Sequence, residues 1–195
     1  AGIFFPQAHL DPKQMAELAA AGHDTLGFDT IMPEFSVQQE AAALGCEMDW
    51  GSPSMMPDAK THPFQRVQDI KIPENLLEKP SMKVVLEALS ILRRQYSDEV
   101  AIVGKVMGPW TISYHMAGTE NFLLWSAIEP DKVRRFLEAL KEVTVLFAKA
   151  QFQAGADVVV LADHATGDLV SPKTYQGFLL PVHKELVQRI GGPLI

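Results

Sequence analysis

The sequence predicts an α/β fold with a parallel sheet, and two observations support this prediction. Short segments of nearly continuous valine, isoleucine and leucine alternate with longer segments whose apolar residues recur at helical spacing. Strands covered by helices on both faces are apolar throughout, whereas half-exposed strands alternate apolar and polar residues. No repeat, low-complexity tract or Gly/Ser linker divides residues 1–195, so we expect a single domain.

Composition and charge argue against several classes of function. Of the 195 residues, 47% are hydrophobic and 21% are charged, as in ordinary globular proteins. The formal net charge of -7 argues against nucleic acid or an anionic membrane as the main partner. No apolar run reaches the length of about 18 residues that a transmembrane helix needs. The single cysteine, Cys46, cannot form an intrachain disulfide and favours a cytoplasmic location.

A helix and a strand are the first expected elements. Asp11 can cap a helix that begins at Pro12, and Gly22 can take the left-handed conformation that ends one. An apolar segment over residues 26–32 then predicts a strand, which Pro33 stops.

The next part of the chain has weaker signals. Ser36 can cap a helix over residues 36–44, and a short strand is expected over residues 46–50. Residues 51–80 are rich in proline and polar residues, with at most a short strand over residues 67–72. A long irregular segment inside a compact domain is often functional.

The rest of the chain carries the strongest periodic patterns. Prolines at helix starts and glycines after helix ends mark the boundaries of its elements. The expected elements are a helix over 81–96, a strand over 100–107, short helices over 111–117 and 121–128, a long helix over 130–153, a strand over 156–162, and a helix over 172–190 that Pro181 kinks. Residues 193–195 are the apolar start of a further strand, so we expect the natural chain to continue.

Polar side chains follow the expected strands at the positions where parallel α/β folds carry their functional residues. Asp163 and His164 come directly after a strand and can act as a base and an acid or bind a cation. The alternative is that Asp163 only ties down its loop while His164 faces solvent. Met107 and Gly108 end the preceding strand, and the glycine can bring backbone amides close to a ligand at a helix start.

Two further residues near these strand ends have open interpretations. Lys105 lies within a strand and points either into the interior, where it needs a partner, or outward between helices. Tyr114 follows the strand that ends at Met107. Because the sequence contains no metalloprotease, serine-elbow or dinucleotide motif, the residues alone indicate a parallel α/β protein with a pocket around Tyr114 and Asp163.

Several segments resemble the uroporphyrinogen decarboxylase superfamily in sequence, order and spacing. They are residues 108–118 (GPWTISYHMAG), 155–163 (GADVVVLAD) and 169–181 (LVSPKTYQGFLLP). Residues 5–12 (FPQAHLDP) and 40–47 (EAAALGCE) are similar to the methylcobalamin:coenzyme M methyltransferase branch. The decarboxylases carry an arginine-rich substrate-binding segment near their N-terminus, and nothing in this sequence resembles it.

The resemblance implies a (β/α)8 TIM-type barrel, of which residues 1–195 form the N-terminal and central part of one domain. It also implies a zinc-dependent methyltransferase that moves a methyl group from a methylated corrinoid (cobalamin) to a thiol such as coenzyme M. The donor arrives on a small corrinoid protein. The family's zinc ligands, a His-x-Cys pair and a later cysteine, would lie beyond Ile195, so we expect no metal ligand in this segment. By the same resemblance Tyr114 and Asp163 line the pocket and Gly108 allows close backbone approach. Together with Met107 and His164 at the strand ends, these residues form the expected corrinoid or substrate pocket.

Three alternatives remain open from the sequence. The first is a decarboxylase that acts on the acidic side chains of a tetrapyrrole. The second is a methyltransferase that loads the corrinoid from a methylated amine or an aromatic ether. The third is a non-catalytic module that binds a corrinoid protein and keeps the fold.

Overall fold

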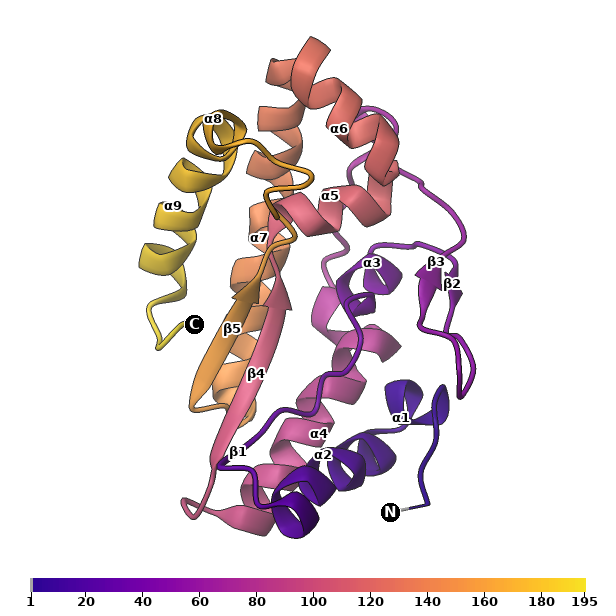
Figure 1. Ribbon diagram of the computed structural model, residues 1–195, viewed down its shortest axis with the longest axis vertical. Helices are drawn as coiled ribbons and strands as arrows, with labels where there is room; N and C mark the ends of the chain where they lie inside the picture. The colour runs from indigo at the N-terminus through magenta and orange to yellow at the C-terminus, as the bar shows by residue number, and fades with distance from the viewer. Residues whose placement is uncertain (1) are drawn as a thin grey trace.

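A computed structural model describes residues 2–195 and contains a parallel sheet of three strands. β1 (Thr30–Ile31), β4 (Ala101–Met107) and β5 (Val158–Ala162) lie side by side in the order β1-β4-β5 (Figure 1). All pairs are parallel, with Thr30 opposite Ala101 and Val103 opposite Val158. Helices connect the strands, which confirms the predicted fold class.

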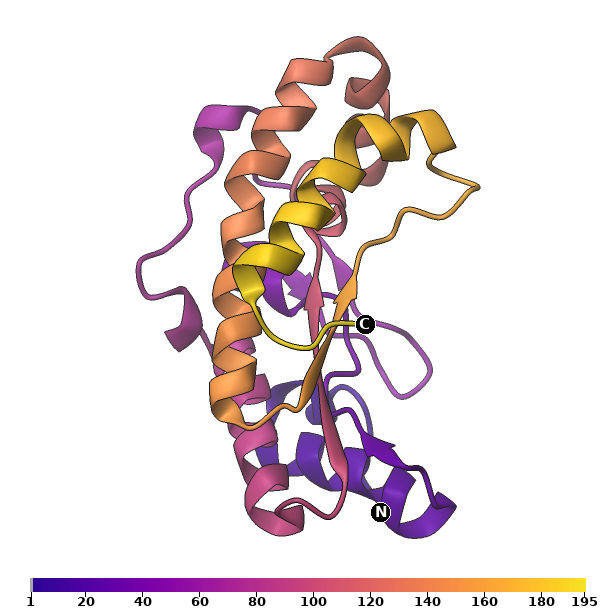
Figure 2. The same cartoon turned by 90° about the vertical axis from the view of Figure 1, so that its left-hand side faces the viewer.

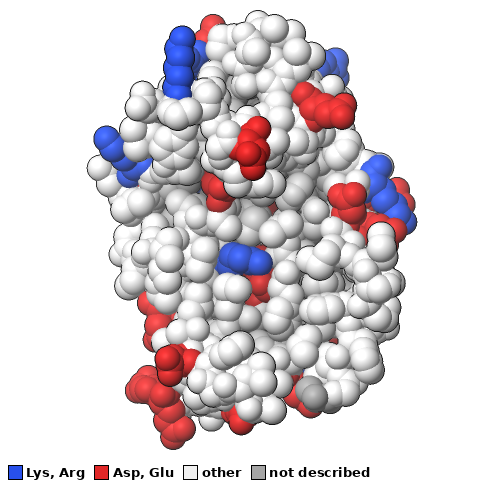
Figure 3. All heavy atoms as spheres, in the orientation of Figure 1, with Lys and Arg blue, Asp and Glu red and all other residues white. Residues whose placement is uncertain are grey.

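Helices cover one face of this sheet. α4 (Pro80–Tyr96) and α7 (Pro130–Ala154) lie behind the strands in Figure 1, and α9 (Leu180–Ile190) packs beside α7. Within residues 2–195, no helix covers the opposite face of β4 and β5, as the side view in Figure 2 also shows. Figure 3 shows that charged side chains on this face gather mainly toward its rim. The open face corresponds to the interior of a (β/α)8 barrel.

Residues 193–195 lie parallel to β5 along its free edge. Leu194 forms a parallel bridge with Val159. The N–H of Val159 donates to Pro193 O at 3.0 Å, and the N–H of Ile195 donates to Val159 O at 3.1 Å. The residues of the expected strand start at 193–195 therefore pair with the free edge of β5 through one isolated bridge.

The first long helix ends later than predicted. α2 (Pro12–Leu26) begins with the expected cap, since Asp11 Oδ1 accepts the N–H groups of Lys13 and Gln14. It continues through Gly22 and ends at Gly27, which has a φ of 74°. A side chain at Gly22 would meet the ring of Phe28, so this glycine provides room for packing and does not end the helix. The expected strand over residues 26–32 shrinks accordingly to β1.

Short elements replace the other weak predictions. Ser36 does not cap a helix, because its Oγ accepts the N–H of Gln38 in a turn before α3 (Gln39–Ala43). The expected strand over residues 46–50 is β2 (Met48–Asp49), which pairs with β3 (Asp58–Ala59) in an antiparallel hairpin. The expected strand over residues 67–72 is wrong. The remaining short elements here are α1 (Gln7–Leu10) and the 3-10 turns η1 (Val67–Asp69) and η2 (Leu76–Glu78).

The segment after β5 is helical, as predicted, but it is widened just before Pro181. It consists of α8 (Pro172–Thr174), the π-helical η3 (Tyr175–Leu179) and α9. The N–H of Leu180 donates to Tyr175 O, five residues back. A proline clashes with the carbonyl four residues before it in a regular α-helix, and a wider turn relieves this clash.

Aromatic side chains fill the core between α7 and the helices that follow β4, α5 (Pro109–Ala117) and α6 (Thr119–Ile128). Trp110, Phe122 and Phe136 are completely buried, and the rings of Trp110 and Phe122 meet edge to face at 5.0 Å. Among residues 2–195, none of the helices combines the length and apolar character needed to cross a membrane.

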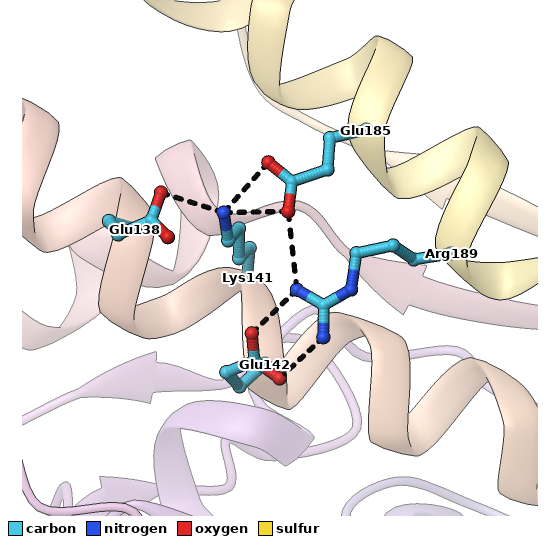
Figure 4. Close-up of polar contacts among 5 residues, drawn as sticks. All are labelled: Glu138, Lys141, Glu142, Glu185 and Arg189. Atoms are coloured by element: carbon cyan, nitrogen blue, oxygen red, sulfur yellow. Dashed lines mark hydrogen bonds and ion pairs between the residues drawn. The ribbon is translucent and has the colours of Figure 1, made fainter.

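Ion pairs join α7 to α9 on the outer surface (Figure 4). Arg189 donates to both oxygens of Glu142, at 2.6 and 2.7 Å, and Nη1 lies 3.3 Å from Glu185. Lys141 Nζ lies 2.7 Å from both Glu138 and Glu185. The network joins α7 to α9, which also carries a residue of the site described next.

Candidate active site at the ends of β4 and β5

A cavity of about 440 Å³ lies at the carboxyl ends of β4 and β5. Its lining combines apolar and polar side chains: Val37, Met107, Thr111, His115, Leu161, Ala162, Asp163 and His164. Three of the five residues that the sequence predicts for the pocket, Met107, Asp163 and His164, therefore line one cavity. Tyr114 and Gly108 lie behind its wall.

Asp163 is tied to protein donors at both carboxylate oxygens. Its Oδ1 accepts the N–H of Thr111 at 2.7 Å and the hydroxyl of Thr111 at 2.9 Å. Its Oδ2 lies 2.9 Å from Nε2 of His183 on α9. The side chain is only 3% exposed. This carboxylate therefore links the start of α5, the end of β5 and α9.

Gly108 provides space for that carboxylate. A Cβ atom at this position would collide with the carboxyl group of Asp163. Its backbone, with φ -70° and ψ 160°, is open to any residue, so the glycine is required by space and not by conformation. The structure thus gives Gly108 a role toward Asp163 that does not involve a ligand.

Tyr114 supports the cavity from inside the core. Trp110 Nε1–H donates to its hydroxyl oxygen at 2.5 Å, and its ring stands edge-on to His164 at 6.1 Å. Burial raises the pKa of Tyr114, the hydrogen bond from Trp110 lowers it, and the charge of Asp163 raises it further. The phenol is therefore protonated at neutral pH.

The two histidines of the cavity differ in environment. Burial lowers the pKa of His115 to about 4, so its imidazole is neutral at physiological pH. His164 is exposed in the cavity, and its backbone N–H donates to the hydroxyl of Thr111 at 2.6 Å. His62 lies on the far side of His115, where its Nδ1 is 2.7 Å from His115 O.

Buried charges lie beside this cavity on the interior face of the sheet. Lys105 is two residues from Met107 on β4 and so points to the same face, which is the inward orientation. Glu34 and Glu40 are fully buried, and Glu40 Oε1 accepts the N–H of Met107 at 2.8 Å. Burial raises the pKa of Glu34 well above its ordinary value, and the neighbouring Glu40 raises it further while Lys105 lowers it. Burial raises the pKa of Glu40 to about 7, although the hydrogen bond from Met107 and the charge of Lys105 lower it.

The described residues do not fit a zinc ion. Within residues 2–195 no three His, Cys, Asp or Glu side chains lie together in a metal-binding arrangement. Burial raises the pKa of Cys46 to about 11, and its Sγ lies 2.9 Å from the Thr61 carbonyl, to which it donates. A thiol in this environment stays protonated and is a poor metal ligand.

The fold agrees with what comparison with known proteins shows. The uroporphyrinogen decarboxylase (URO-D) family profile matches residues 1–195, and the chain belongs to this family. A methylated-thiol–coenzyme M methyltransferase of Methanosarcina mazei is 36% identical over 195 residues, covering 98% of this chain and 52% of that protein. The methylcobamide:CoM methyltransferase MtaA of Methanosarcina barkeri is 32% identical over 180 residues, covering 91% and 53%.

A solved structure shows the same architecture. A methyltransferase from Methanosarcina mazei superposes with a TM-score of 0.95 at 30% identity, covering 99% of this chain and 58% of that one. The predicted resemblance to the methyltransferase branch is thereby confirmed. The chain spans about half the length of the curated relatives it matches.

The sequence did not single out every residue that the site brings together. Thr111 and His115 belong to the same strand-end motif as Gly108, so their place in the cavity wall had a local signal. His183 lies in the first turn of α9, 20 positions after Asp163, and nothing in the local pattern marks it. Only the packing of α9 against α7 brings it to the carboxylate.

Proposed function

We propose that the protein is a corrinoid-dependent methyltransferase that transfers a methyl group from a methylated corrinoid protein to a thiol such as coenzyme M. The observation that carries this proposal is similarity over nearly the whole chain to enzymes that are named as coenzyme M methyltransferases. A cytoplasmic location is part of the same proposal.

The composition of the cavity supports methyl transfer over decarboxylation. A tetrapyrrole with several carboxylates needs a cluster of cationic side chains, because each buried anion must be paired. Among the residues that line the described cavity there is no arginine or lysine. Apolar groups such as Met107 and Leu161 are compatible with the transfer of an uncharged methyl group between bulky, weakly polar reactants.

Zinc is part of the proposal but has no ligands in the described segment. When bound, zinc holds a thiol as its nucleophilic thiolate. We expect its ligands beyond Ile195, and no step is assigned to residues 2–195 through the metal. The proposed role of these residues is to shape the cavity, exclude water and hold His164 and His115 at its wall.

The proposal is tested on the protein expressed at the full length that its gene encodes. Methylcobalamin and coenzyme M are added, and conversion of methylcobalamin is followed by its visible absorbance, with zinc measured by metal analysis. We expect thiol-dependent demethylation together with about one zinc per chain, the stoichiometry of a single catalytic site.

Other outcomes identify the alternatives. Release of carbon dioxide from uroporphyrinogen without demethylation would establish the decarboxylase. The protein could instead fail to demethylate methylcobalamin with thiols and methylate a reduced corrinoid from methylated amines or ethers. This result would show that the methyl group is transferred onto the corrinoid. Binding of a corrinoid protein without turnover would indicate a non-catalytic module.

A further inference from the structure

A chain of hydrogen bonds runs from the π-helical segment to the cavity wall. Tyr175 Oη lies 3.2 Å from His183 Nδ1, and His183 Nε2 lies 2.9 Å from Asp163 Oδ2. Asp163 Oδ1 then accepts both polar hydrogens of Thr111. The hydroxyl of Thr111 in turn accepts the N–H of His164 at 2.6 Å.

The chemistry of the partners allows one consistent direction for the bonds of this chain. An ionised Asp163 only accepts hydrogen bonds, so Nε2 of His183 carries the hydrogen between them. In the tautomer with its hydrogen on Nε2, His183 has a lone pair at Nδ1 that can accept the O–H of Tyr175. Thr111 uses its one hydroxyl hydrogen toward Asp163 and a lone pair toward His164. Every bond in the chain thus has one donor and one acceptor.

The widened helical turn belongs to this arrangement. Tyr175 and His183 are eight residues apart, and their rings meet edge to face at 5.7 Å. Tyr175 is the first residue of η3, and this wider turn changes the faces that Tyr175 and His183 present, compared with a regular α-helix. The ion pairs of Arg189 and Lys141 link α9 to α7, as Figure 4 shows.

We infer that His183 is a positioning residue, which holds Asp163 and thereby fixes, through Thr111, where His164 stands in the cavity. Both oxygens of Asp163 are engaged by protein donors, which suits it to holding the wall and leaves His164 as the exposed polar group facing a ligand. As a contribution to catalysis, the inference rests on the proposed methyl transfer. The geometric part does not depend on that activity.

The first experiment measures the position of His164 without any turnover. Histidine ring resonances are recorded by NMR on the full-length protein for His183→Ala, His183→Gln and the surface variant Gln188→Ala on the same helix. We expect His183→Ala to shift the His164 resonances, His183→Gln to restore most of the shift through its amide donor, and Gln188→Ala to leave them unchanged. A folded His183→Ala protein with unchanged His164 resonances would overturn the inference.

A gentler variant covers the case in which His183→Ala does not fold. Tyr175→Phe removes only the hydroxyl that orients the imidazole, and it should shift the His164 resonances by a smaller amount in the same direction. Unchanged His164 resonances in this variant, with His183 itself shifted, would count against the chain of contacts.

The second experiment uses the thiol-dependent demethylation of methylcobalamin. Misplacing a residue at the reaction site costs roughly tenfold to a hundredfold in rate, so we expect His183→Ala to lose about that much in kcat with a smaller change in KM. His183→Gln should recover most of it. If the NMR shifts appear as expected but the unmodified protein shows no demethylation, the proposed function fails while the positioning role stands. If all variants keep full kcat, the contribution of His183 to catalysis is overturned, and the NMR shifts alone decide its positioning role.

Discussion

Gln151 of α7 holds both backbone polar groups of Lys105 on β4. Its Oε1 accepts the N–H of Lys105 at 2.8 Å, and its Nε2 donates to Lys105 O at 2.6 Å. The backbone groups of Ile102 and Gly108 form hydrogen bonds on the β5 side. Because these groups alternate along a strand, the backbone N–H and C=O of Lys105 point toward the β1 side. β1 pairs with β4 no further than Ile102. The side chain of Gln151 therefore makes the hydrogen bonds to Lys105 that a longer neighbouring strand would make.

Gln151→Leu should destabilise the protein by about 3 kcal/mol, because it leaves a buried N–H and a buried carbonyl without partners. The free energy of unfolding from urea titration measures the loss. Gln153→Leu is the matched control, since Gln153 is exposed on the same helix, and it should change stability by less than about 0.5 kcal/mol. Equal losses in the two variants would show that the contact to Lys105 contributes nothing.

Glu40 makes stability depend on pH. Its pKa rises from 4.5 to about 7 on folding, so the folded state binds the proton more tightly than the unfolded state. This contribution is fully present below pH 4.5 and is lost as pH rises toward 7. Glu34 acts in the same direction.

Glu40→Gln should remove part of this dependence. Glutamine keeps an acceptor for the Met107 N–H but cannot ionise. We therefore expect the free energy of unfolding of Glu40→Gln to exceed that of wild type by on the order of 3 kcal/mol above pH 7 and by little below pH 4.5. Urea titrations at several pH values measure this difference. Glu17→Gln, an exposed change on α2, should leave the pH dependence as it is. A constant offset between Glu40→Gln and wild type across the pH range would contradict the assignment.

Gly108→Ala should destabilise the protein, although the backbone conformation at this position is open to alanine. The new methyl group meets the carboxyl of Asp163, which is held by three hydrogen bonds and has little room to move. We expect a loss of about 2 kcal/mol and a shift of the His164 ring resonances. Gly167→Ala is the control, because a Cβ there meets nothing within 4 Å. Indistinguishable variants would refute the steric role of Gly108.

Arg189→Ala should lower the free energy of unfolding by only about 1 kcal/mol. The loss is small because Arg189 and Glu142 are both partly exposed and solvent screens the pair (Figure 4). Salt should reduce the difference from wild type. Arg189→Lys should recover only part of it, because lysine cannot make the two parallel bonds to Glu142. Lys83→Ala, which breaks an exposed pair 3.8 Å long, should be close to neutral in thermal unfolding. A neutral Arg189→Ala would show that the network does not hold α9.

Long periodic segments could be read from the sequence with accuracy. The predicted helices over residues 81–96 and 130–153 and the strand over 100–107 agree with α4, α7 and β4 to within one residue. Many apolar positions repeat the same signal there, and proline or glycine marks the ends. Gly22 misled the prediction because one glycine can end a helix or admit a neighbouring ring, and only the position of Phe28 distinguishes the two.

The sequence by itself determined the class of fold, the family resemblance and the two strand ends that meet at the cavity, because these depend on patterns local to each segment. Tertiary structure decided that Lys105 faces the interior, that Gly108 makes room for Asp163 and that His183 holds the carboxylate. Each of these relationships joins residues from different elements. Its energy depends on burial and on distances that exist only after the helices have packed on the sheet.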